Sequence, residues 1–153
     1  MNQLDEIDLC LIRELQKDCK QSIKQLANKV NLSITPTHER IKRLESNGII
    51  NKYMAIVNPQ TLGKTLLAYC QVTLVKHQGS DFIEFEEHVK GMDEILEVSY
   101  IAGNYDVLLK VILNDMNDYQ NFIIEKISQL GVISNIQTSF VIKQTKNNSI
   151  IMP

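Results

Sequence analysis

The chain has 153 residues, of which 44% are hydrophobic, and it carries a formal net charge of −2 at pH 7. This length and composition exclude a disordered chain and allow either one ordinary domain or two small ones. No apolar run reaches the roughly 18 residues of a membrane span, and the N-terminus lacks the order of a signal peptide, so the sequence predicts a cytoplasmic protein. The three cysteines, Cys10, Cys19 and Cys70, lack CxxC spacing and are expected to be reduced core residues, with no metal bound.

Charge is distributed unevenly along the chain. Between Lys20 and Lys52, seven Lys and Arg stand against two Glu, which gives this segment a charge of +5. From Asn58 onward, seven Lys stand against eleven Asp and Glu, a charge of −4. A basic segment suits a negatively charged partner such as nucleic acid. The sequence therefore predicts a basic module joined to an acidic one.

Two short helices are predicted at the start of the chain. The first spans about Asp5–Asp18, because apolar residues recur there at helical spacing and acidic residues occupy the first turn. The second begins after Ser22, which is suited to an N-cap, and stops at Asn31, a residue that tolerates left-handed backbone angles. Only a tight turn over residues 31–33 separates this helix from the next one.

A third helix completes a helix-turn-helix pattern. It is expected to open at Thr35-Pro36, where a hydroxyl cap precedes a proline, and to close at Asn47-Gly48. The residues expected to face inward across the two crossing helices are Leu26, Ala27, Val30, Leu32, Ile41 and Leu44.

Two β-prone runs follow the third helix, on either side of Asn51-Lys52. They predict a short hairpin beside the helices, which would make the module a winged helix-turn-helix. Residues 58–64 then carry Pro and Gly with little periodicity, at the place where the charge changes sign. This segment is expected to be the linker between two domains.

The sequence thus predicts four parts. They are a winged helix-turn-helix domain over residues 1–57, a linker over 58–65, a second domain over 66–143 and a C-terminal tail over 144–153. Two interpretations of the tail remain open: it is disordered, or it packs in an oligomer through Ile150, Ile151 and Met152.

The second domain alternates strands and helices in the order βαββαβ. Strands are expected over residues 66–75, 95–102, 105–113 and 133–143, with helices over 80–89 and 116–130. Both helices would cross one face of the sheet, so the expected fold class is α+β with a ferredoxin-like layer. The bare face would carry residues such as Tyr69, Gln71, Thr73 and Leu109 or their alternates, and burying it requires a second copy of the domain. At least a dimer is expected.

The third helix presents a polar ridge. At about 100° per residue, Thr37, Ile41 and Leu44 face inward. The residues turned outward are His38, Glu39, Lys42, Arg43 and Ser46, with Arg40 on the flank. Such a ridge suits the major groove of DNA, where residues near the helix N-terminus reach base edges and Lys and Arg reach phosphates. A solvated surface helix is the alternative, and the turn, the hairpin and the charge of +5 argue against it.

Two long stretches resemble one known family. LDEIDLCLIRELQKD and SIKQLANKVNLSITPTHERIKRLESNGIINKYMAIVNPQTLG are similar to the DNA-binding half of the Lrp/AsnC regulators, and YIAGNYDVLLKV resembles their sensor-domain hairpin. The resemblance implies control of amino-acid metabolism genes, a domain that senses an amino acid, and dimers that assemble into an octamer of four dimers. It also implies double-stranded DNA as the partner and places the DNA-reading segment on Ser33, Thr35, Thr37, His38, Arg40, Lys42 and Arg43, with Lys52 in the wing.

The same resemblance implies an effector site between sensor domains. The matching positions here are Tyr100, Ile101, Ala102, Gly103, Asn104, Tyr105, Asp106, Thr138 and Ser139. From the residues alone, two interpretations stay open: the backbone amides and the Asp106 carboxylate of this turn hold the charged ends of an amino acid, or Gly103 and Asn104 simply form a hairpin turn that needs left-handed backbone angles. This chain has Ile101-Ala102 before the glycine, where family members that bind polar amino acids are richer in hydroxyl residues. That departure favours an apolar effector such as leucine or methionine.

Catalytic interpretations find little support. His38, His77 and His88 lie in different predicted elements, and no Ser-His-Asp, HExxH or glycine-rich phosphate motif occurs. We therefore expect no enzyme, no metal and no cofactor besides an amino-acid effector. Two other classes stay open: an architectural, nucleoid-type DNA-binding protein that needs no ligand, and an amino-acid-binding regulatory subunit of an enzyme, which the charge of +5 argues against.

Overall fold

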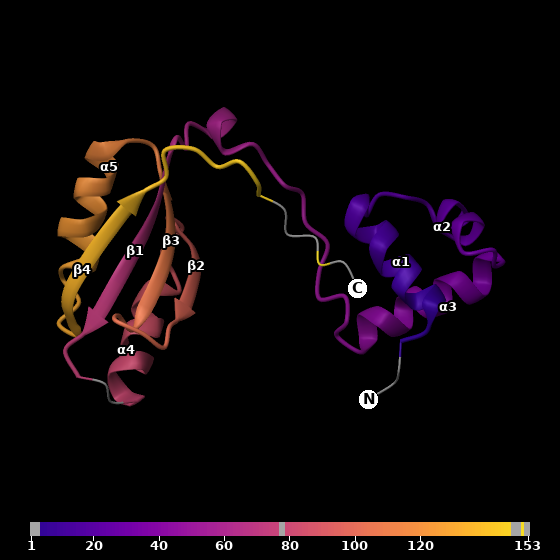
Figure 1. Cartoon of the computed structure of the whole chain (residues 1–153), viewed down its shortest axis with the longest axis horizontal. Helices are drawn as coiled ribbons and strands as arrows, with labels where there is room; N and C mark the ends of the chain where they lie inside the picture. The colour runs from indigo at the N-terminus through magenta and orange to yellow at the C-terminus, as the bar shows by residue number, and fades with distance from the viewer. Residues whose placement is uncertain (1–3, 77–78, 148–150, 152–153) are drawn as a thin grey trace. The chain divides into compact units, whose positions relative to one another are not determined.

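The computed structural model describes residues 4–76, 79–147 and 151, and the chain divides into two compact units (Figure 1). One unit comprises Met1–Ile56 together with Lys146–Pro153, and the other comprises Val57–Thr145. We refer to them as the helical unit and the sheet unit. None of the helices in the described ranges is long and apolar enough to cross a membrane.

The helical unit is built from three helices, α1 (Glu6–Lys17), α2 (Ile23–Lys29) and α3 (Ile34–Ser46). α1 begins at a capping box in which Asp5 and Asp8 bond each other's backbone N–H, and α2 begins at a similar box made by Ser22 and Gln25. The helices enclose a core of Leu11, Leu15, Leu26, Val30, Ile41 and Leu44. The structure confirms the predicted helix-turn-helix and the inward direction of Ile41 and Leu44 on α3.

The start of α3 differs from the prediction. The helix begins at Ile34 with Ser33 as its N-cap, so Pro36 lies at the third helical position instead of the first. Proline is tolerated throughout the first turn, because the N–H groups there have no partner within the helix. Asn31 adopts a left-handed φ of 54°, as predicted.

The predicted hairpin after α3 is wrong for this chain. Residues 49–57 are all described and contain no strand. Ile56 and Val57 are 88% and 55% exposed, so the second β-prone run has no apolar surface to pack against. An isolated hairpin without such packing is marginal in water. The N–H groups of Ile49 and Ile50 instead donate to the Leu44 carbonyl of α3 at 2.9 and 3.1 Å. Further along the segment, the Tyr53 hydroxyl donates to Glu45 at 2.8 Å.

The C-terminal tail bonds to α1. The backbone N–H of Ile151 donates to Oε1 of Gln16 at 2.8 Å, and Nε2 of Gln16 donates to the Ile151 carbonyl at 2.7 Å. The Ile151 side chain is exposed, so its backbone and not its apolar surface makes the contact. Ile150 and Met152, on which the choice between a disordered tail and one packed in an oligomer also depends, lie outside the described residues.

The sheet unit opens with a 3₁₀ turn, η1 (Pro59–Leu62), inside the segment expected to be an irregular linker. The turn begins at Asn58, whose side chain accepts the Gln60 N–H, and it ends at the left-handed Gly63. The elements that follow are β1 (Leu66–Leu74), α4 (Gly79–Val89), β2 (Ile95–Tyr100), β3 (Val107–Leu113), α5 (Met116–Asn121), the π-helical segment η2 (Phe122–Ile127) and β4 (Ile133–Phe140). The sheet is antiparallel with strand order β2-β3-β1-β4, which confirms the ferredoxin-like prediction.

Both helices pack on one face of this sheet. Phe85 of α4 and Phe122 of η2 are buried in the same core as alternate residues of β1 and β3. Leu109 is fully buried in this core, so the expectation that it lies on the bare face is wrong. Its alternates Leu108, Lys110 and Ile112 take that place beside Tyr69, Gln71 and Thr73, and these six residues are partly exposed. A one-residue error in strand phase reverses every side chain, which is why the pattern alone left the two sets interchangeable.

Glu14 on α1 predicts a pH dependence of stability. Lys17 and Lys29 both donate to its carboxylate, and the bond from Lys17 is 2.6 Å long. These bonds lower the pKa of Glu14 to about 2. A lowered folded-state pKa stabilises the fold above the unfolded value of about 4.5, and this contribution is lost as the pH falls toward 2. We expect the difference in melting temperature between wild type and Glu14→Gln to be constant above pH 5 and to shrink below it. A difference that persists unchanged to pH 2 would contradict this assignment.

Candidate DNA-binding and effector-binding sites

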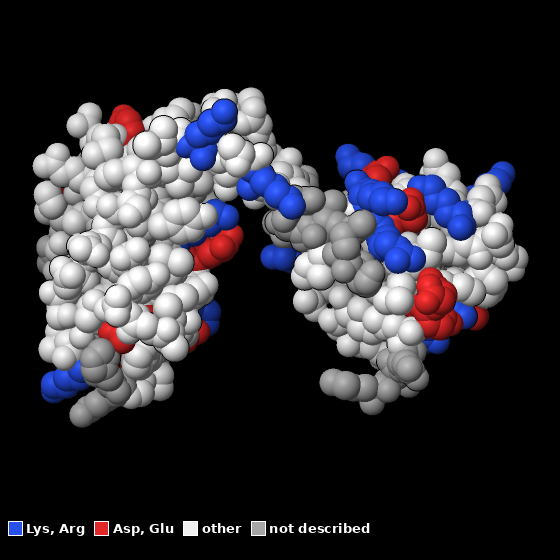
Figure 2. Space-filling model, in the orientation of Figure 1, with Lys and Arg blue, Asp and Glu red and all other residues white. Residues whose placement is uncertain are grey.

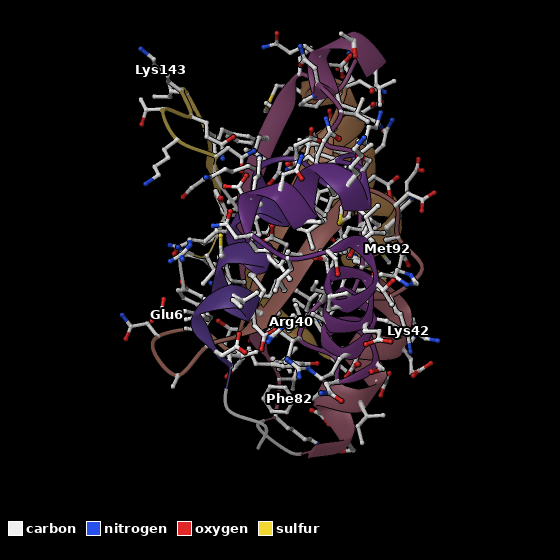
Figure 3. All side chains as sticks on the ribbon, turned by 90° about the vertical axis from the view of Figure 1, so that its right-hand side faces the viewer. Glu6, Arg40, Lys42, Phe82, Met92 and Lys143 are labelled. Carbon is white, nitrogen blue, oxygen red and sulfur yellow. The ribbon has the colours of Figure 1, made fainter. Side chains whose placement is uncertain are left out.

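Helix α3 has one exposed face, one face buried in the helical unit, and one side on which its two arginines form ion pairs. Thr37, Ile41 and Leu44 are buried against the helical unit. Arg40 and Lys42 leave the helix on opposite sides, as Figure 3 shows. The predicted DNA-contacting residues that are exposed are Ser33, Thr35, His38, Lys42, Arg43 and Lys52. Lys42 bonds to none of the described residues, so its ammonium group is available to a phosphate.

Thr37 has to be removed from the predicted DNA-contacting set. Its side chain is fully buried, and its hydroxyl donates to the Ser33 carbonyl at 2.9 Å. The helical spacing already turned Thr37 inward, and only the resemblance placed it among the DNA-reading residues. The buried hydroxyl satisfies a backbone group in the first turn of α3.

Two carboxylates at the start of α1 bind the two arginines of α3. Nη1 of Arg40 donates to Oδ2 of Asp5 at 2.6 Å and to Oδ1 of Asp8 at 2.8 Å. Nη2 of Arg43 donates to Oδ2 of Asp8 at 2.6 Å. The Asp8 backbone N–H and the Arg40 side chain hold the pKa of Asp5 below its ordinary value, while Asp5 and Asp8 raise the pKa of Arg40. Arg40 and Arg43 are thus anchored within the protein.

This cluster has no signature in the sequence. Asp5 and Asp8 are accounted for there by the positive end of a helix, and the arginines follow 32 to 35 residues later. The charge of +5 in the segment containing the arginines is therefore partly neutralised by acidic residues outside it. On the face drawn in Figure 2, Lys and Arg of the helical unit lie interleaved with Asp and Glu.

A hollow of about 520 Å³ adjoins the exposed part of α3. Its apolar floor consists of Leu15, Ile23, Leu26 and Ile41, and its polar rim consists of Cys19, Gln21, His38, Lys42, Glu45 and Tyr53. Burial and the bond to Glu45 raise the pKa of Tyr53 to about 12, so its hydroxyl remains a donor at neutral pH. The hollow places His38 and Lys42 beside the segment that leaves α3.

The predicted effector loop, residues 101–106, connects β2 to β3. The backbone of Ile101 donates to the Asp106 carbonyl at 2.8 Å, and the Asp106 backbone donates to Val72 at 3.0 Å. Oδ2 of Asp106 accepts the N–H of Leu74 at 2.8 Å, so this carboxylate supports β1. The loop joins the antiparallel pair β2 and β3 as a hairpin, but Gly103 and Asn104 do not adopt the left-handed backbone angles expected of them. Ala102, Gly103 and Asn104 are exposed.

The remaining predicted effector residues do not gather around this loop within one chain. Tyr100 turns toward α4, where its hydroxyl donates to the Phe82 carbonyl at 3.3 Å. Thr138 bonds Cys70 on the helix-covered face of the sheet, whereas Ser139 pairs with Tyr69 and lies on the uncovered face. In addition, β4 is separated from the loop's own strands by β1.

A smaller hollow of about 210 Å³ lies near the end of β3 that is remote from the loop. Among the groups lining it, Lys126 donates to Oε1 of Glu94 at 2.6 Å. Oε2 of Glu94 is buried and accepts no bond from the described residues. Among all the residues that the structure describes, no group of three or more His, Cys, Asp or Glu is arranged to hold a metal ion.

Comparisons with known sequences match both units. The family profile "Lrp/AsnC ligand binding domain" matches residues 67–151, and the profile "Winged helix-turn-helix DNA-binding" matches residues 4–51. The chain is 35% identical to the leucine-responsive regulatory protein of Haemophilus influenzae over 149 residues, 97% of this chain and 90% of that protein. It is 37% identical to the proline dehydrogenase transcriptional activator of Rhizobium radiobacter, again over 149 residues, 97% of this chain and 96% of that protein.

Solved structures are similar over nearly the whole chain. A transcriptional regulator of Neisseria meningitidis in complex with L-Met has a TM-score of 0.92 and 27% identity, over 96% of this chain and 95% of that one. AsnC of Escherichia coli has a TM-score of 0.90 over 99% of both chains, and at 22% identity it shows the fold alone.

Proposed function

Because the chain belongs to the Lrp/AsnC family of transcriptional regulators, which bind DNA and are not enzymes, we propose that it is a sequence-specific regulator that responds to an amino acid. The observation that carries the DNA part is the exposed surface of α3. Ser33, Thr35 and His38 lie in its first turns, where side chains reach base edges in the major groove. Lys42 and Lys52 supply phosphate contacts.

Replacing Lys42 with alanine tests the phosphate contact. Each phosphate contact contributes about 0.9 to the slope of log K against log salt, so Lys42→Ala is expected to flatten the slope by about that amount. The measurement is a salt titration of binding to a random-sequence DNA duplex. Lys90→Ala, at the exposed residue that follows α4, removes the same charge from the sheet unit and serves as the matched control. Equal slopes for wild type and Lys42→Ala would exclude Lys42 as a phosphate ligand.

We propose leucine or methionine as the effector. Two observations support an apolar amino acid: the loop carries Ile101-Ala102 without hydroxyl groups, and the similar Neisseria meningitidis regulator was solved with L-Met. The relative from Haemophilus influenzae is named for its response to leucine. Backbone N–H groups of residues 102–104 would receive the effector's carboxylate.

Assembly completes the proposed site. Residues 101–106 and Ser139 do not meet within one chain, and one face of the sheet has no covering element among the described residues. A second copy packed on that face would bury it and bring its own Ser139 or loop to the site. A homodimer, extended to an octamer of four dimers, is the assembly we propose, and the ligand would act by favouring one assembly over another.

A thermal-shift screen against the twenty amino acids, with assembly size measured for each hit, tests this proposal. Leucine or methionine is expected to stabilise wild type. Gly103→Ala is expected to weaken the apparent affinity about tenfold, which removes about 1.4 kcal/mol of stabilisation at saturating ligand. The fold tolerates this methyl group, since an added Cβ meets only Ile101 Cγ2 at 3.8 Å.

Gly131→Ala is the matched control, because an added Cβ there meets nothing within 4 Å. An unchanged response in Gly103→Ala would show that the loop does not bind the effector. If none of the amino acids shifted the wild-type transition while DNA binding was intact, the ligand-independent architectural function would replace the one proposed here.

A further inference from the structure

We propose that Asp8 determines how strongly the protein discriminates against non-specific DNA, because it holds Arg40 and Arg43 of α3 away from the phosphate backbone. The inference rests on α3 being the DNA-reading helix. Asp8 touches no DNA in this proposal. It is a positioning residue that acts through the two arginines.

The geometry around Asp8 is that of a saturated buried carboxylate. The residue is 1% exposed and lies in the first turn of α1. Its Oδ1 accepts from Arg40 at 2.8 Å, and its Oδ2 accepts from Arg43 at 2.6 Å and from the Asp5 backbone at 3.3 Å. Withdrawing either arginine would leave part of a buried charge without its partner, which is strongly unfavourable.

The two arginines differ in their access to DNA. The Arg40 side chain is 24% exposed and is shared by Asp5 and Asp8 through a single nitrogen. The Arg43 side chain is 46% exposed and bonds only Asp8 among the described residues, so it is the group that a phosphate could attract. Asp8 and a phosphate therefore compete for the guanidinium of Arg43.

The competition bears on specificity because non-specific affinity comes almost entirely from phosphate contacts. Asp5 and Asp8 together neutralise two positive charges on α3, while Lys42 on the opposite side keeps its charge. The helix thus enters the groove with fewer sequence-independent contacts than its composition indicates. Discrimination between sites then depends more on base contacts. Lowering the affinity for wrong sites raises the ratio of specific to non-specific affinity.

Asp8→Asn is the decisive variant. The amide keeps one acceptor oxygen and loses the charge, so Arg43 is expected to reach a phosphate. On a random-sequence duplex the slope of log K against log salt should steepen by about 0.9. Between 200 and 50 mM salt, affinity should therefore rise about 3.5-fold more for Asp8→Asn than for wild type. A purely structural defect would lower affinity and would not steepen the slope.

Two further variants isolate the mechanism. Glu6→Gln is the matched control, because it removes the same charge from the first turn of α1 while Asp5 and Asp8 still bind both arginines, and its slope should equal that of wild type. Arg43→Ala combined with Asp8→Asn should return the slope to the wild-type value. An unchanged or flatter slope for Asp8→Asn that is folded by circular dichroism would overturn the proposal.

Arg43→Ala in the otherwise wild-type chain decides the matter if Asp8→Asn does not fold. The proposal predicts an unchanged slope, because Asp8 already withholds Arg43, and a slope flatter by about 0.9 would overturn it. Failure of the wild-type protein to bind any duplex would instead remove the DNA-binding role of α3. That outcome is distinct from normal binding with the wrong slope in these variants.

Discussion

Leu44→Ala is expected to destabilise the helical unit by about 2–5 kcal/mol and to abolish DNA binding. Leu44 is fully buried in the middle of the core formed by α1, α2 and α3. Truncation to alanine loses the transfer free energy of the removed methyl groups and leaves a cavity between the helices. A unit of this size has only a few kcal/mol of stability to lose, so the loss removes the platform on which α3 is held.

Denaturant unfolding followed by circular dichroism measures this effect. Ile34→Ala on the same helix is the matched control, because Ile34 is 53% exposed and its truncation should change the unfolding free energy by no more than about 0.5 kcal/mol. The sheet unit has its own core and should retain its transition and its ligand response in Leu44→Ala. Equal destabilisation by the two substitutions would mean that α3 does not pack as described.

Phe85→Ala is expected to cost the sheet unit about 3–5 kcal/mol and to remove the amino-acid response. Phe85 of α4 is fully buried, with 0% of its surface exposed, in the core that it shares with β1 and β3. The loop that connects β2 to β3 is held by backbone bonds to β1, so its conformation depends on the packed sheet. Losing the aromatic ring opens a large cavity beneath that sheet.

Ile83→Ala provides the control on the same helix, since Ile83 is 65% exposed. A two-step unfolding curve is expected for Phe85→Ala, with the helical unit melting at its wild-type position. If both units instead melted together at a lower temperature, they would form one cooperative structure. The independent cores of the two units argue for separate transitions.

Local signals were sufficient for most of the fold. Apolar spacing placed the helices and strands within a few residues, and Ser22 and Asn31 marked the ends of α2 because their chemistry acts on the nearest backbone groups. The order βαββαβ, with short connections, then left the ferredoxin-like sheet as the natural arrangement. Thr37 was turned inward by helical spacing, in agreement with its burial.

Contacts between distant segments escaped prediction from the sequence. The anchoring of Arg40 and Arg43 by Asp5 and Asp8 depends on how closely α1 approaches α3, and charge counted along a segment cannot register it. Thr138 and Ser139 face opposite sides of the sheet because of the register of β4 on β1, and amino-acid composition does not determine that register.

The sequence by itself therefore determined the elements, their order, the helix-turn-helix and the family resemblance. The tertiary structure alone decided which cations of α3 are free, which face of the sheet each residue takes, and that residues 49–57 form no hairpin in this chain. The reason is physical: periodicity and capping act over a few residues, whereas ion pairs and sheet register depend on segments that meet only when the chain has folded.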